Sequence, residues 1–242
     1  MTTTLTTPFT GVPQNPCSLE EGTFLKIDAK INHRNFLRKI YGILLYQLII
    51  TVFMCYFAMY NDAIQNYVLT NTAPLVAGTI FSFVFLFMLF CYQDSHPHNM
   101  WILTAFTISI SYTVAVTCAS YVSLGYKTLV IKSFLITILT FVILTIFTFQ
   151  SKYDFGFMEE LVVGGISVLI FWGILNWIMG TDGGIGYSLL GIFIFVCAII
   201  YDTHRLKDKF RHDEYILASV NLYLDILNLF LYILDFMKKM ND

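Results

Sequence analysis

The sequence predicts an all-α integral membrane protein, a bundle of six or seven transmembrane helices, and two observations lead to this fold class. Asp, Glu, Lys and Arg make up 12% of the 242 residues, about half the ~25% usual in soluble domains, whereas 57% of the residues are hydrophobic. The mean hydropathy is +0.70, and the apolar residues gather in long segments. So few charges could not cover the surface of a soluble chain, which excludes a soluble enzyme, a nucleic-acid-binding protein and a disordered regulator.

We expect residues 1–30 to form a mobile tail in the cytosol, ahead of a single multi-span membrane domain over residues 31–242. The tail is rich in Thr and Pro and has no apolar core like that of a cleaved signal peptide. A basic run follows directly before the first apolar segment, and it consists of Lys26, Lys30, Arg34, Arg38 and Lys39. This pattern is typical of an uncleaved signal-anchor whose basic end stays in the cytosol.

Seven apolar segments predict the membrane spans, and each has about the ~20 residues that a helix needs to cross a bilayer. Only helices and closed barrels satisfy their own backbone groups in lipid, and runs without period-two alternation indicate helices. The segments lie at about 40–60, 73–92, 100–123, 128–149, 160–180, 184–202 and 215–236. The connections between them are short and polar.

The Lys and Arg residues near the ends of the spans predict the orientation. With the N-terminus in the cytosol, the opposite side holds only Lys127 among the loops of the first six spans. The last segment leaves two alternatives open. A full crossing puts Lys238 and Lys239 on the non-cytosolic side, whereas a re-entrant hairpin keeps them in the cytosol. The absence of Gly and Pro from 215–236 favours a continuous helix.

A polar stripe runs along this last segment. At 100° per residue its members fall within a sector roughly 100° wide, and Leu, Ile, Val, Phe and Tyr occupy the remaining surface. The stripe consists of Glu214, Ala218, Asn221, Asp225, Asn228, Tyr232 and Asp235. Such a stripe must face the protein interior or water rather than lipid.

Asp225 lies near the middle of the segment and is the leading candidate site residue. A carboxylate at this depth costs at least ~2.5–3.5 kcal/mol, so it indicates a functional site unless it is a neutral Asp bonded to its helix neighbours. Asn221 and Asn228 flank it by one turn on either side, as pore residues or as contacts between helices.

Asp202 is the expected partner of Asp225, because the sixth and seventh segments are antiparallel neighbours joined by a short loop. Two carboxylates in one low-dielectric site cannot both ionise cheaply, so the pair is expected to share a proton or bind a cation. Calcium suits such an oxygen-rich site, although water or carbonyl groups must complete its 6–8 ligands. The structural alternative is that Asp202 ends a helix and pairs with Arg205, His204 or solvent.

Three other classes of membrane protein fit less well. Tyr201-Asp202 matches half of an intramembrane aspartyl protease signature, but no glycines precede Asp225, so we do not expect an enzyme. Nothing resembles the Asp-Arg-Tyr or Asn-Pro-x-x-Tyr elements of a seven-span receptor, and no internal repeat indicates a transporter. A path for cations fits the stripe best.

The end of the chain also carries a family resemblance. Residues 199–204 read Ile-Ile-Tyr-Asp-Thr-His, and the run from Asp213 to Phe230 surrounds Asp225. Shorter agreements lie at 36–44, 96–97 and 150–155. From about residue 33 to the end, the chain resembles the transmembrane Bax-inhibitor-motif (lifeguard) family.

The resemblance implies a helical bundle around the last hydrophobic segment, in Golgi and endoplasmic reticulum membranes, that suppresses apoptosis and lets calcium leak from stores. It places Asp202 and Asp225 on the family's paired aspartates, whose proton-sensitive contact gates the leak. Asp213 falls on a position linked to cation selection, with Glu214 beside it at the cytosolic mouth. The implied partners are the bilayer, calcium ions and protons, with no cofactor and no nucleic acid. The alternative is a non-conducting scaffold that binds other apoptosis-regulating membrane proteins or itself.

Overall fold

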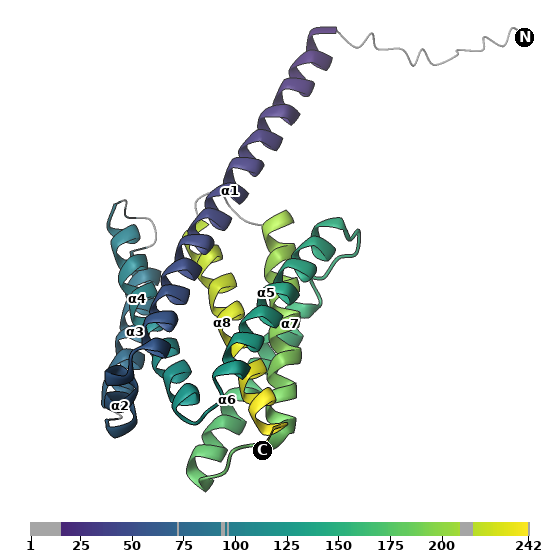
Figure 1. Ribbon diagram of the computed structural model, residues 1–242. Coiled ribbons are helices and arrows are strands. Elements are labelled where there is room, and N and C mark those ends of the chain that lie inside the picture. The colour runs from purple at the N-terminus through teal and green to yellow at the C-terminus, as the bar shows by residue number, and fades with distance from the viewer. Residues whose placement is uncertain (1–15, 72, 93–94, 96, 209–214, 242) are drawn as a thin grey trace, which may run out of the picture.

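The computed structural model describes residues 16–71, 73–92, 95, 97–208 and 215–241, and within these ranges it contains helices and no strand (Figure 1). The predicted all-α class is confirmed. The helices are α1 (Pro16–Tyr60), α2 (Asp62–Thr70), α3 (Ala73–Cys91), α4 (His98–Ser123), α5 (Lys127–Gln150), α6 (Met158–Met179), α7 (Gly184–Asp208) and α8 (Tyr215–Lys239).

The N-terminal part of the chain differs from the expected tail. Helix α1 begins at Pro16 and projects well beyond the rest of the bundle (Figure 1). Proline suits the first turn of a helix because its fixed φ is already helical and its missing N–H is not needed there. Residues 16–30 are therefore helical, residues 1–15 lie outside the described part of the chain, and the mobility of this segment stays a prediction.

Helix α2 lies in a connection that the sequence pattern left without structure. Asn61 caps it, because its side chain accepts hydrogen bonds from the backbone N–H groups of Ala63 and Ile64. The helix has only 9 residues, so it joins α1 to α3 and does not cross the membrane.

Helix α7 continues to Asp208, past the expected end at residue 202. Arg205 and Lys207 lie in its last turn, where positive side chains interact favourably with the helix dipole. The α5–α6 connection holds this end, since Lys207 Nζ donates to the Ser151 carbonyl at 2.9 Å and His204 Nε2 lies 2.9 Å from Asp154 Oδ1. Asp202 therefore lies inside a helix and not at its end.

Helix α8 is continuous and central. It packs against α1, α4, α5 and α7, and 67% of its most apolar stretch is buried, against 11% for α6. Its end lies beside the α6–α7 connection, where Lys239 Nζ donates to the carbonyls of Asp182 and Gly184. The two ends of α8 thus lie at opposite ends of the bundle (Figure 1), and the re-entrant alternative is wrong.

The outer helices present an apolar surface. Among the described residues, six helices are long and apolar enough to cross a membrane, and α3 contributes a shorter apolar helix, Leu75–Cys91. Large apolar side chains such as Phe83, Leu135 and Phe171 are exposed on the outside of α3, α5 and α6. An apolar surface of this extent is unfavourable in water and favourable in lipid. The chain is therefore a multi-pass membrane protein.

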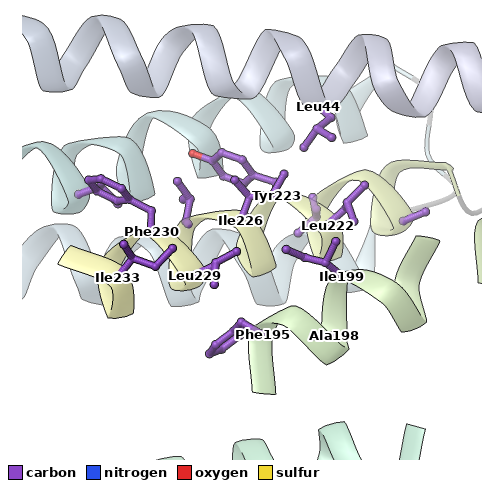
Figure 2. Close-up of a cluster of buried hydrophobic side chains, with 14 of the residues drawn as sticks. Leu44, Phe195, Ala198, Ile199, Leu222, Tyr223, Ile226, Leu229, Phe230 and Ile233 are labelled. Carbon is purple, nitrogen blue, oxygen red and sulfur yellow. The ribbon is translucent and has the colours of Figure 1, made fainter. Parts of the chain in front are cut away.

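The core forms around α8. Figure 2 shows Leu222, Ile226, Leu229 and Ile233 of α8 among buried side chains that include Leu44 of α1 and Ile199 of α7. A helix that is buried on most of its circumference needs apolar residues outside its polar stripe, and α8 has them. The polar stripe is therefore enclosed by protein on several sides.

Candidate functional site

The structure brings together the two carboxyl groups that the sequence predicted as a pair. Asp202 of α7 and Asp225 of α8 meet between the two helices, close enough for their carboxyl groups to interact. Asp225 is only 9% exposed. Two carboxyl groups can hydrogen-bond to each other only when one of them carries a proton, because a carboxylate is an acceptor alone. This arrangement can hold one proton between two helices.

Charged and polar side chains surround the pair. His204 Nε2 lies 2.9 Å from Asp154 Oδ1 in the α5–α6 connection. The positive charge that acts on Asp202 is Arg205, one turn along the same helix. Among the described residues, Asp225 Oδ2 is buried without a hydrogen-bond partner. A buried oxygen in that state is costly, and a proton, a water molecule or a cation would relieve the cost.

A large cavity begins one turn from Asp225. It has a volume of about 510 Å³, which is room for several water molecules. Asn228, Tyr232 and Asp235 line it from α8, together with Thr117 of α4 and Tyr187 of α7. A smaller hollow between α4 and α8 shares Thr117, Asn228 and Leu231 with it. Asp225 lines neither of them, although Asn228, one turn away on the same helix, lines both.

A buried hydrogen-bond cluster lies on the opposite side of α8 from the carboxyl pair. Tyr223 Oη lies 2.7 Å from Thr51 Oγ1 and 3.2 Å from Ser111 Oγ, and the last two atoms are 2.8 Å apart. Gln47 Nε2 donates to Thr107 Oγ1 at 3.3 Å nearby. These contacts tie α1 and α4 to α8. The polar stripe did not include Tyr223, although a buried Tyr hydroxyl usually has a hydrogen-bond partner.

The other candidates have mixed outcomes. Asn228 lines the cavity and donates to the Leu224 carbonyl at 2.9 Å. Asn221 is partly buried and lines neither hollow. Asp213 and Glu214 lie outside the described residues, so their place at a mouth of the bundle stays a prediction.

Together, the fold and the site define a class: a multi-pass helical membrane protein with a pair of carboxyl groups between α7 and the central helix α8. The chain belongs to the Bax inhibitor family, because residues 33–242 match the family model described as "Inhibitor of apoptosis-promoting Bax1". This match confirms the resemblance seen in the sequence and covers nearly the whole of the bundle.

Relatives from a virus, an animal and a plant are similar over most of the chain. The Golgi anti-apoptotic protein of vaccinia virus (strain Lister) is 35% identical over 207 residues, which are 85% of this chain and 86% of the viral protein. Protein lifeguard 4 of Mus musculus is 34% identical over 207 residues, 85% of each chain. The BI1-like protein of Arabidopsis thaliana is 32% identical over 209 residues, 84% of this chain and 80% of the plant protein.

Proposed function

We propose that this chain is an anti-apoptotic protein of Golgi and endoplasmic reticulum membranes that acts as a pH-sensitive cation (calcium) leak. The names of the relatives support the anti-apoptotic role and the Golgi location. The observation that supports the leak is the contact between Asp202 and Asp225, one turn from a cavity that can hold several water molecules. From Asn228 to Asp235 the polar stripe lines this cavity, and the carboxyl pair comes next along the helix.

The gate works through the shared proton. With the proton present, the carboxyl groups bond to each other and hold α7 against α8. Its loss leaves two negative charges in a low-dielectric site, and their repulsion favours separation or entry of a cation. Raising the pH removes the proton, so the leak increases as pH rises and decreases as pH falls.

The direction of the leak follows from the proposed orientation. With the N-terminus in the cytosol, the cavity faces the lumen of the store, and Asp213 and Glu214 flank the cytosolic mouth. Calcium then passes from the cavity, past Asn228 and the separated carboxylates, to the cytosol. A modest leak of this kind lowers stored calcium, and a lower store raises the threshold for apoptosis.

Reconstitution of Asp225→Asn tests the gate. We expect calcium flux through wild-type protein in liposomes to rise with pH between about pH 5.5 and pH 8, by up to about tenfold per pH unit when one proton controls opening. The amide cannot ionise, so the variant keeps a low flux that does not change with pH. A calcium-sensitive dye inside the liposomes measures both.

Glu160→Gln is the matched control, because Glu160 is an exposed carboxylate in the first turn of α6. It should keep the wild-type pH profile. Unchanged flux and unchanged pH dependence in Asp225→Asn would contradict the assignment of Asp225 to the gate. The scaffold alternative instead predicts no flux from pure protein, together with retained cell protection in Asp202→Asn and Asp225→Asn cells.

A further inference from the structure

The ammonium group of Lys239 sits among four oxygen atoms at the cavity end of α8. Lys239 Nζ lies 2.6 Å from Asp235 Oδ2, 2.9 Å from the Asp182 carbonyl oxygen, 3.1 Å from the Gly184 carbonyl oxygen and 3.1 Å from Ser188 Oγ. We call these four atoms the oxygen cage. A lysine ammonium has only three N–H donors, so it cannot give each of the four oxygen atoms of the cage its own hydrogen. Mixed carboxylate, carbonyl and hydroxyl oxygens around one positive charge are the ligand set of a hard metal cation.

The carbonyl side of the cage is fixed by its own loop and does not need Lys239. Gly183 and Gly184 both have φ of +68°, a conformation that residues with a Cβ rarely adopt. A Cβ on Gly183 would also overlap the Asn176 side chain. Asn176 in turn bonds to Thr181, through its carbonyl oxygen at 3.0 Å and its Oδ1 at 3.1 Å. The loop therefore holds its carbonyl groups in the same positions whether or not the Lys239 ammonium is present.

The surroundings can complete the ligand set of a divalent ion. Asp182 and Asp235 both line the cavity of about 510 Å³, which also offers space for water ligands. Calcium takes 6–8 oxygens at about 2.3–2.6 Å, so the cage must contract by a few tenths of an ångström and add water. Lys239 is only 15% exposed but sits on a flexible four-carbon stem that can swing into the cavity.

We propose that the oxygen cage is a calcium-binding site and that the Lys239 ammonium is its tethered occupant, which a calcium ion displaces. The proposal explains why a lysine is stable on the side of the bundle that the positive-inside rule disfavours: its charge is satisfied by fixed oxygens. It goes beyond the proposed function, because binding at the cage requires neither conduction nor the carboxyl pair.

Terbium luminescence on the purified full chain in detergent tests the site. Tb³⁺ substitutes for Ca²⁺ and is excited through nearby aromatic rings, and Tyr187 and Tyr232 line the same cavity. We expect Lys239→Met, which keeps the stem and removes the charge, to bind Tb³⁺ at least about tenfold more tightly than wild type, equivalent to ~1.4 kcal/mol. Ca²⁺ should displace the ion, and adding Asp235→Asn should abolish the gain.

Lys238→Met is the matched control. It removes the same charge from the neighbouring position, where Lys238 lies over the Tyr121 ring at 5.8 Å and outside the cage. Equal gains in the two variants would mean a general charge effect and would overturn the proposal, as would no gain in Lys239→Met. If Lys239→Met does not fold, Lys239→Gln serves instead, because its amide can still donate to the loop carbonyls. Since no flux is measured, failure here is separate from failure of the leak.

Discussion

The two halves of α8 use the same polar stripe in opposite surroundings. In the first half Asp225 is sealed between α7 and α8, and Tyr223 bonds to Thr51 and Ser111 on the other side. In the second half Asn228 and Asp235 line a cavity. A polar stripe therefore shows which face avoids lipid, but packing decides which part of that face is dry and which part holds water.

The difference has an energetic consequence. A charge in the sealed half is matched mainly by a proton or by another side chain, because little of it is exposed to water. A charge in the cavity half can be solvated in place. Equal substitutions in the two halves should thus have unequal effects. The lysine and hydroxyl pairs below measure that inequality, and the glycine pair measures how closely α7 packs on the cavity half.

The largest contrast is expected for an introduced lysine. Tyr223→Lys places a cation in the sealed half beside the hydroxyl groups of Thr51 and Ser111, and should cost about 3–5 kcal/mol, as for other uncompensated buried charges. Asn228→Lys, in the other half, can extend into the cavity and should cost less than about 1 kcal/mol. Melting temperatures in detergent measure both, with a difference of at least about 4 °C expected. Similar melting temperatures would contradict the separation of α8 into sealed and open halves.

A smaller contrast is expected where α7 meets α8. Gly191 packs against the Tyr232 ring so closely that a Cβ there would overlap the ring atoms, whereas a Cβ on Gly186 meets nothing within 4 Å. Gly191→Ala should destabilise the protein by about 1–3 kcal/mol through overpacking. Gly186→Ala should change stability by no more than about 0.5 kcal/mol. If the Tyr232 ring moves into the cavity, the two variants will have similar melting temperatures. That result would mean that the Tyr232 ring is not held in place by its packing.

The smallest contrast concerns hydroxyl groups. Tyr223→Phe removes two buried hydrogen bonds between helices and should cost about 0.5–1.5 kcal/mol. Tyr232→Phe removes one bond, to Tyr187 Oη at 3.1 Å, beside a cavity whose water can replace it, so its cost should lie near zero. Chemical unfolding of the two variants in the same detergent compares them. A larger loss in Tyr232→Phe would reverse the assignment of dry and wet halves.

The sequence pattern was sufficient to predict the long apolar helices and the pairing of Asp202 with Asp225. Apolar runs of membrane length predict helices because lipid permits little else, and a lone Asp in such a run needs a partner on a neighbouring helix. Asp202 is the acid that ends the sixth apolar run, directly before the connection between the last two segments, so the pairing followed from topology.

Other features had no pattern that could predict them. Helix α2 is too short for a periodic signal, and α7 continues past residue 202 because contacts from the α5–α6 connection hold its polar end. The oxygen cage depends on the carbonyls of Asp182 and Gly184. Every residue has a carbonyl, so only the folded loop shows which ones point at Lys239.

The anchoring of α7 and α8 also limits how these helices can move. The α5–α6 connection pins α7 beside Asp202 through His204 and Lys207, whereas α8 is pinned at its far end by Lys239. If α8 tilts about Lys239 when the carboxyl groups part, the hydrogen bonds of Tyr223 to Thr51 and Ser111 must shift with it. The lever from Lys239 to Asp225 is about 21 Å long at the helical rise, so a tilt of roughly 8° opens a gap of about 3 Å. A small rocking motion, with no unwinding of either helix, is enough to admit a water molecule.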